Sequence, residues 1–299
     1  MDQTIKSMSR HAKRRWKNFL IRLRNNDLIY FPYTFFRGLI SANKYRKVHS
    51  ILMFLGYPRS GSSTLASLLD AHKNIIIAHE LNLLHYVQHK YGPRQIFFML
   101  DKNSRILAAK ERVSAGYKGV VDGQYNGRSD RCLIIGDKKA GSTSRSLMTN
   151  PVLLAKIRLL FGKKLKCIHI IRNPFDMIAT QSYGGNEKKK PLRLNGLEYA
   201  INQCFEKIDT ISKIKEMNEF DIFDIRHENL IADPDYELRR LFDWLEAELY
   251  PGYLEACKRH LYDQPHRSRF RVNWTEEQKK MVQKKIDSTS FLSGYHFKS

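Results

Sequence analysis

The sequence lacks the cysteine patterns of proteins stabilised by bound metal ions or by a disulfide framework, and it lacks the long apolar runs of membrane-spanning proteins. Its four cysteines stand far apart, and no Cys-x-x-Cys pair or Cys/His cluster occurs, so the spacing predicts no metal site. The most aromatic stretch, 28–40, is interrupted by Pro32 and Arg37 and is shorter than the ~20 apolar residues that cross a bilayer. We therefore expect buried free thiols, although the pattern leaves disulfides open, and no membrane-spanning helix.

Acidic residues are few relative to basic ones. The 299-residue chain has 52 Lys and Arg against 30 Asp and Glu, which gives a net charge of +22. Residues 1–47 hold twelve of these basic residues and two of the acidic ones, so +10 of the charge lies in this segment. Such a charge attracts nucleic acid, an anionic membrane or a polyanionic ligand, and it does not distinguish among them.

We divide the chain into a basic helical and aromatic arm, 1–47, and one domain, 48–299. In the arm, Trp16, Phe19 and Leu20 recur at helical spacing among basic residues. Such a segment suits a membrane surface or an acidic partner, but a helix packed on the domain with a solvated basic face is the simpler interpretation. Any peripheral membrane contact is expected through this arm.

The remainder alternates between apolar strand-like runs and segments with helical periodicity. With 42% hydrophobic residues, the chain can bury a substantial core. Connections of this length between strands favour a parallel sheet covered on both faces. We predict a single α/β domain with a P-loop-like central sheet of about five strands at 51–57, 74–78, 132–136, 165–171 and 220–225. Residues 114–131 and 183–194 are predicted loops.

A strand, a tight loop and a helix are predicted within residues 51–69, ILMFLGYPRSGSSTLASLL. This arrangement directs backbone N–H groups and the positive end of a helix dipole at one spot, which suits a phosphate. Gly56 and Gly61 have the spacing of a Walker A loop, but the lysine that should follow is absent and Arg59 is the local cation. A turn that binds nothing is the alternative. The loop residues that we expect to contact an anion are Arg59, Ser60, Gly61, Ser62, Ser63 and Thr64.

The stretch GYPRSGSSTLASLLDAH resembles the 5′-phosphosulfate loop of the sulfotransferase superfamily, whose members use 3′-phosphoadenosine 5′-phosphosulfate (PAPS). Its PRSG form is most similar to the tyrosylprotein and carbohydrate branch. A second stretch, IHIIRNPFDMIATQSY, resembles the family's 3′-phosphate element, in which an Arg after a strand is followed eight residues later by Ser. Arg172 fits the Arg, and Thr180 takes the place of the Ser. The resemblance implies a PAPS site without a metal.

The resemblance also implies catalytic roles. Aligning DAH with the same residues of the tyrosylprotein branch places the family's glutamate base on Glu80, with His79 and His85 as rivals. Lys138, in its GDK context, matches the family's lysine that neutralises the sulfonate, although Lys139 is an alternative. Arg59 is expected to hold the 5′-phosphate and the sulfonate. Two further segments resemble nucleotide-covering elements: 225–234, where His227 replaces a tyrosine, and the basic stretch 266–274, with Ser268 and Arg269.

We therefore predict a sulfotransferase that moves a sulfuryl group from PAPS to a hydroxyl or amine by in-line displacement and releases 3′,5′-adenosine bisphosphate. Two other classes stay open. A P-loop kinase or hydrolase would hold magnesium on Asp137, and a non-catalytic polyanion-binding module would bind in a salt-sensitive way. The acceptor is a carbohydrate, a peptide tyrosine, a lipid or a small alcohol, and no specific nucleic acid is expected. Without an anchor segment, we expect a cytoplasmic enzyme of bacterial type. The sequence does not indicate the oligomeric state.

Overall fold

The computed structural model describes residues 27–113, 118–182 and 196–299. The basic segment of the arm before residue 27 and the predicted loop at 183–194 lie outside the described residues. In the part described, no helix is both long and apolar enough to cross a membrane.

A five-stranded parallel sheet forms the centre of the domain, with strand order β2-β3-β1-β4-β5. All five strands predicted from the sequence are confirmed within about two residues at each end. The fold class is confirmed as α/β. The strands are β1 Ser50–Leu55, β2 Ile75–His79, β3 Ile134–Lys138, β4 Leu165–Ile171 and β5 Asp221–Arg226.

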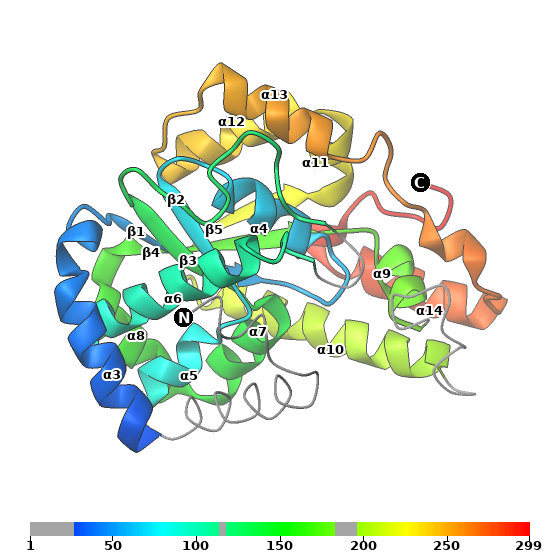
Figure 1. Ribbon diagram of the computed structural model, residues 1–299. Helices are drawn as coiled ribbons and strands as arrows, with labels where there is room; N and C mark the ends of the chain where they lie inside the picture. The colour runs from blue at the N-terminus through cyan, green and yellow to red at the C-terminus, as the bar shows by residue number, and fades with distance from the viewer. Residues whose placement is uncertain (1–26, 114–117, 183–195) are drawn as a thin grey trace, which may run out of the picture.

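Alternating side chains of the strands enter two separate cores, one on each face of the sheet. Met53 and Ile135 belong to the core beneath helices α6 (Pro93–Ala108) and α8 (Pro151–Phe161). Leu52 and Ile134 belong to the core beneath helices α4 (Ser62–Asp70), α12 (Pro234–Leu245) and α13 (Pro251–His260). This division follows from the two-residue period of a strand. A third core joins helices α9 (Pro174–Ser182), α10 (Gly196–Glu216) and α14 (Glu276–Asp287). Figure 1 shows these three helices together at the right-hand end of the sheet.

The helices are α3 Asp27–Ile40, α4 Ser62–Asp70, α5 Leu83–Gln88, α6 Pro93–Ala108, α7 Ala140–Thr149, α8 Pro151–Phe161, α9 Pro174–Ser182, α10 Gly196–Glu216, α11 His227–Ala232, α12 Pro234–Leu245, α13 Pro251–His260 and α14 Glu276–Asp287. Local chemistry explains several of their ends. The Asp233 side chain accepts from Tyr236 N, and Pro234 opens α12, as a capping aspartate followed by proline predicts. Sequence periodicity did not reveal α7 or α13.

The aromatic part of the arm forms α3, which packs along α6 (Figure 1). Thr34 on α3 is fully buried, and the Gln95 side chain of α6 donates to both Thr34 Oγ1 and Phe31 O. Tyr45, after α3, is buried in the core beneath α6 and α8. The described part of the arm is therefore continuous with the packing of the domain.

Candidate active site

The loop between β1 and α4 turns sharply because three of its residues have positive φ. Gly56 and Gly61 have φ of 141° and 94°, and Arg59 has φ of 70°. A Cβ on Gly61 would lie 2.3 Å from His227 Nδ1, so glycine is required here for space as well as for its backbone conformation. His227 therefore packs against the loop, and burial lowers its pKa to about 3, with Arg172 and His266 adding to the effect.

The hydroxyl groups of this loop face different environments. Ser62 and Ser63 line a cavity of about 630 Å³ that begins at the loop. Ser60 is fully buried and donates to Tyr57 O at 3.1 Å, whereas Thr64 is buried in the first turn of α4. Arg59 also lines the cavity, and its buried Nε has no hydrogen-bond acceptor among the described residues. An anion held by the loop would give this donor a partner.

Two strand ends bring the predicted base and the predicted lysine together. Lys138 Nζ lies 3.0 Å from Glu80 Oε1, and both side chains line the cavity. The Lys138 side chain is 5% exposed and that of Glu80 54% exposed. Burial opposes ionisation of Glu80, but the charge and hydrogen bond of Lys138 outweigh it and hold the pKa of Glu80 below its usual value. Burial lowers the pKa of Lys138, although Glu80 opposes the change.

Asp137 holds the segment that carries Glu80. Its two carboxylate oxygens accept from Leu81 N at 3.0 Å and from Leu83 N at 2.9 Å. Glu80 and Asn82, which alternate with these donors, have φ of 57° and 70°, a conformation that persists only where the surroundings enforce it. Burial raises the pKa of Asp137 to about 6, against the lowering effect of these backbone hydrogen bonds. Sequence reasoning assigned Asp137 only to a magnesium site and missed this positioning contact.

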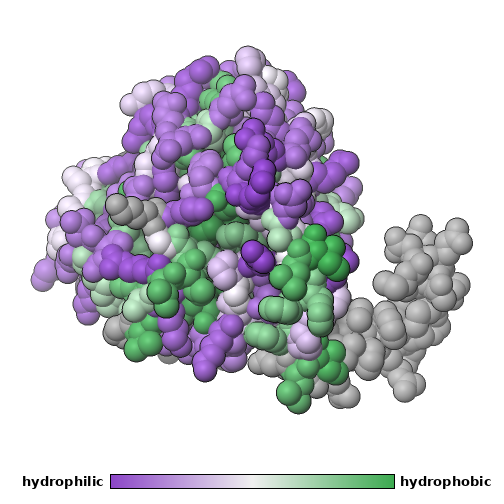
Figure 2. Space-filling view, turned by 90° about the vertical axis from the view of Figure 1, so that its left-hand side faces the viewer, coloured by the Kyte–Doolittle hydropathy of each residue, from purple (hydrophilic) through white to green (hydrophobic). Residues whose placement is uncertain are grey.

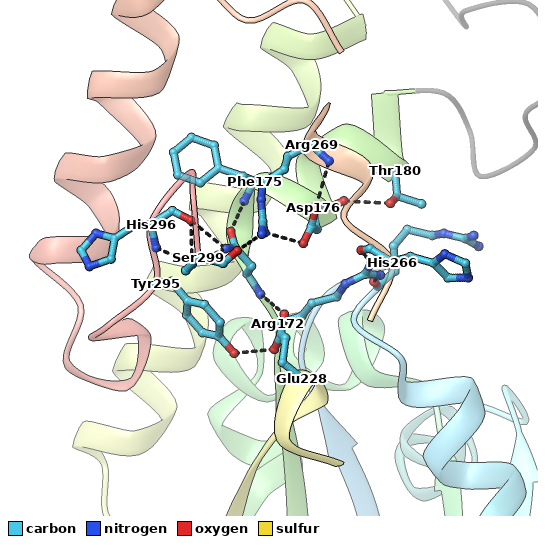
Figure 3. A network of polar contacts seen from close by, with 12 residues as sticks. Arg172, Phe175, Asp176, Thr180, Glu228, His266, Arg269, Tyr295, His296 and Ser299 are labelled. Carbon is cyan, nitrogen blue, oxygen red and sulfur yellow. Dashed lines mark hydrogen bonds and ion pairs between the residues drawn. The ribbon is translucent and has the colours of Figure 1, made fainter. Parts of the chain in front are cut away.

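Arg172 lies outside this cavity and joins two segments of backbone (Figure 3). It donates to Arg59 O and to His266 O, each at 2.8 Å. The guanidinium is largely buried, and burial lowers its pKa while Asp176 and Glu228 oppose the change. Arg172 thus fixes the loop of Arg59 against the basic stretch that begins at His266.

Thr180 is placed beside the same basic stretch, but its hydroxyl donates to Asp176 O at 2.8 Å within α9. The Asp176 carboxylate in turn accepts from Arg269 N at 2.9 Å and from Arg269 Nη1 at 2.7 Å. Arg269 is buried, so it anchors the stretch onto α9. The structure brings Arg172, Thr180 and the 266–269 segment into one network and leaves their role in ligand binding a prediction.

The far wall of the cavity comes from residues that no motif indicated. Helix α7 contributes Ser142, Arg145 and Ser146, and α10 contributes Lys207. Lys207 and Arg145 each contact Glu206 Oε1, at 3.1 and 3.3 Å. The helical spacing of apolar residues in α10 indicates that Lys207 lies on the buried side of this helix. That Lys207 reaches the cavity depends on tertiary packing, which the sequence pattern does not show. The charged residues of the cavity are Arg59, Glu80, Lys138, Lys139, Arg145 and Lys207.

The parallel sheet has a glycine-containing loop between β1 and α4 and charged residues at the carboxyl ends of neighbouring strands. This arrangement defines a P-loop-like α/β protein. No group of three or more potential metal-ligating side chains occurs within 27–113, 118–182 and 196–299. Residues 52–251 match the family model described as the sulfotransferase family. The chain belongs to the sulfotransferase family.

Solved structures of similar fold include the sulfotransferase domain from the curacin biosynthetic pathway, with 18% identity over 80% of this chain and 96% of that chain, and a TM-score of 0.49. Sulfotransferase STF9 from Mycobacterium avium has 11% identity over 82% and 77%, with a TM-score of 0.47. Mouse sulfotransferase SULT7A1, solved with PAP, has 13% identity over 77% and 69%, with a TM-score of 0.41. Comparison with curated proteins gave no significant match.

Proposed function

We propose that this protein transfers a sulfuryl group from PAPS to a hydroxyl or amine of an acceptor. The observation that carries the proposal is the ion pair of Glu80 and Lys138, which opens into the same cavity as the Arg59 loop. One carboxylate and two cations beside an anion-binding loop are the groups that sulfuryl transfer requires. The base takes the acceptor proton, and the cations offset charge on the sulfonate and on the leaving phosphate.

In this mechanism each residue has one task. Glu80 accepts the proton of the acceptor hydroxyl while the acceptor oxygen bonds to sulfur and the bond between sulfur and the bridging phosphate oxygen breaks. Lys138 stays protonated and stabilises the negative charge that moves onto the bridging oxygen. Arg59 and the backbone of the loop hold the 5′-phosphate. The products are the sulfated acceptor and 3′,5′-adenosine bisphosphate.

The contacts of Asp137 favour this reaction over ATP hydrolysis or a kinase reaction. Both carboxylate oxygens of Asp137 accept backbone N–H groups in a buried position, and Asp137 is not among the residues that line the cavity, so it holds the 81–83 segment rather than facing a bound nucleotide. The lysine that grips the phosphates in a Walker A loop is also absent, since Ser62 follows Gly61. The network of Arg172 lies beside the loop and supports the proposal that a 3′-phosphate is read there.

The far wall of the cavity favours a polar acceptor that carries negative charge. Lys207 lines this wall although its side chain is only 8% exposed, and it shares one carboxylate, Glu206, with Arg145, so two cations of the wall face a single negative charge. Arg145 and Lys139 add two further cations to the same cavity. An acidic carbohydrate or an acidic peptide meets this requirement better than an uncharged lipid or alcohol.

The first experiment is calorimetric binding of 3′,5′-adenosine bisphosphate, with AMP and ATP as competitors, at moderate salt and without magnesium. Tighter binding of the bisphosphate than of AMP is the expected result, because only the bisphosphate carries the 3′-phosphate. Weak and equal binding of all three, lost at high salt, would instead favour a polyanion-binding module. Tighter binding of ATP in the presence of magnesium would favour the kinase or hydrolase. Either result would overturn the proposal.

A further inference from the structure

Helix α3 packs on the domain through the side that carries Tyr30, Phe31, Thr34 and Gly38. Gly38 approaches α6 so closely that a Cβ at this position would lie 2.9 Å from Arg94 C and O. Thr34, one turn earlier, is fully buried and bonds to Tyr30 O and Phe31 O. The close approach at Gly38 leaves no room for a side chain at that position, whereas Tyr30 and Phe31 on the same side pack against the core beneath α6 and α8.

The opposite side of α3 carries the large apolar residues. Phe36 is 63% exposed, Ile40 74% and Leu28 86%. Residues 28, 29, 36, 39 and 40 fall on one arc of the helix at 100° per residue, opposite Thr34 and Gly38. In Figure 2, which looks onto the side of the molecule where α3 lies, apolar side chains gather in patches at the surface. The residues of this outward face are Leu28, Ile29, Phe35, Phe36, Leu39 and Ile40.

This pattern is the reverse of that of a helix exposed to water. A surface helix normally turns charged side chains outward, but Arg37 is the only charged residue between 28 and 40. A contiguous apolar face of this kind marks an interaction surface rather than a solvated one. Aromatic and branched side chains on a helix that is too short to span also suit insertion at the boundary of a bilayer.

The charge around α3 indicates what covers the face. The net charge of residues 1–47 is +10, and the exposed Arg46 and Lys47 lie shortly after the helix, beyond the short 3-10 helix at Ala42–Tyr45. A second copy seated on this face would bring two such segments together, and like charges oppose that arrangement. An anionic lipid surface satisfies both requirements, because it takes up apolar side chains and attracts the flanking cations.

We propose that α3 docks the protein on an anionic membrane surface through its outward apolar face, with the exposed Arg46 and Lys47 beyond the helix contacting lipid headgroups. This attachment is peripheral and does not depend on the sulfuryl-transfer chemistry. It would hold the enzyme at a membrane while the cavity, which is built from other elements, remains formed.

The test is co-sedimentation of the full chain with vesicles of phosphatidylcholine, with and without about a third of phosphatidylserine. We expect binding to the anionic vesicles, a loss of at least about tenfold in F36S/I40S, and weakening as salt rises from about 0.1 to 0.5 M. The matched control is Y236S/M281S, which changes two exposed side chains of α12 and α14 and should bind like the wild type.

Thermal unfolding of both variants separates docking from folding. If Phe36 and Ile40 belong to no core of this chain, F36S/I40S unfolds at the wild-type temperature. A marked fall in its unfolding temperature would show that the face is covered within the chain and would overturn the proposal. So would vesicle binding that survives F36S/I40S, no vesicle binding at all, or a dimer in analytical ultracentrifugation that F36S/I40S abolishes.

Discussion

Glu80 and Lys138 meet at the ends of two adjacent parallel strands. Glu80 N donates to Lys138 O at 3.0 Å, which extends the ladder between β2 and β3, and the two side chains form the ion pair in the cavity. The backbone bond places the carboxylate and the ammonium at the same height above the sheet. The pair is therefore a consequence of strand register rather than of flexible loops.

Glu80→Gln should lower kcat by about 10²–10⁴, because the amide cannot take the acceptor proton. Binding of 3′,5′-adenosine bisphosphate should be unchanged, since Gln keeps the size of the side chain. Steady-state kinetics and calorimetry measure the two effects. Glu111→Gln is a matched control, because Glu111 is an exposed glutamate with φ of 56°, close to the 57° of Glu80. Turnover of the Glu80 variant at the wild-type rate would exclude this residue as the base.

Lys138 and Lys139 have different surroundings, and this difference predicts different effects of their removal. Only Lys138 bonds to Glu80, and its side chain is buried. Lys138→Ala should lower kcat at least about 10²-fold, as removal of a preorganised charge from an active site does, whereas Lys139→Ala should lower it less than about tenfold. Because burial lowers the pKa of Lys138, wild-type activity should fall on the alkaline side before pH 10.5. The opposite ranking of the two variants would assign the active-site lysine to Lys139.

Asp137 should act as a positioning residue, and its protonation should produce a separate step in the dependence of activity on pH. As the pH falls, Asp137 takes up a proton near pH 6, and the 80–83 segment then loses one of its acceptors. Burial would raise the pKa of Glu80, but its ion pair with Lys138 holds that pKa below its usual value, so Glu80 does not account for a step near pH 6. Activity should therefore decline through about pH 6 on the acid side. Asp137→Asn should lower kcat about tenfold or more, leave the KM for the donor nearly unchanged, and remove the step near pH 6.

The stability of the Asp137 variant provides the control. The amide of Asn turns an N–H₂ group toward one backbone N–H, and a buried donor left without an acceptor costs about 1–3 kcal/mol. A variant that lost this stability but kept kcat and the step near pH 6 would show that Asp137 supports only the fold.

Much of the site could be predicted from the sequence, because the carboxyl ends of parallel strands lie at one edge of the sheet. That rule predicts that Arg59, Glu80, Lys138 and Arg172, each of which follows a predicted strand, lie together. The first three line one cavity, whereas Arg172 lies outside it. The rule could not predict the direct ion pair, which requires β2 and β3 to be neighbours in the order β2-β3-β1-β4-β5. Arg145 and Lys207 were missed for the same physical reason, since packing of α7 against α10 brings them to the cavity.

Arg145→Ala should raise the KM for an anionic acceptor about three- to tenfold and leave binding of 3′,5′-adenosine bisphosphate unchanged. The expected effect is moderate because the Arg145 side chain is 59% exposed and shares Glu206 with Lys207, so solvent screens its charge. Acceptors matched in size, with and without a carboxylate or sulfate, give the comparison. An equal change in KM for charged and uncharged acceptors would contradict the charge preference.

Arg172 has two possible tasks, and one pair of ligands distinguishes them. Its guanidinium donates to Arg59 O and His266 O, so its loss should loosen the phosphate loop and weaken every adenine nucleotide. If Arg172 also reads the 3′-phosphate, Arg172→Ala should weaken the bisphosphate at least about tenfold more than AMP, because a hydrogen bond to a charged group contributes about 1.5–3 kcal/mol. Calorimetry of both ligands measures that ratio.

Arg172→Lys is the control that keeps the positive charge but removes the planar guanidinium. Lysine keeps the cation but cannot donate to two carbonyl groups in the planar geometry of arginine. If the 3′-phosphate is read through charge, the lysine variant should recover part of the preference for the bisphosphate while its unfolding temperature stays below that of the wild type. Equal weakening of bisphosphate and AMP in both variants would assign Arg172 to the support of the loop alone, and the 3′-phosphate would then have to be held by other residues of the 266–269 segment.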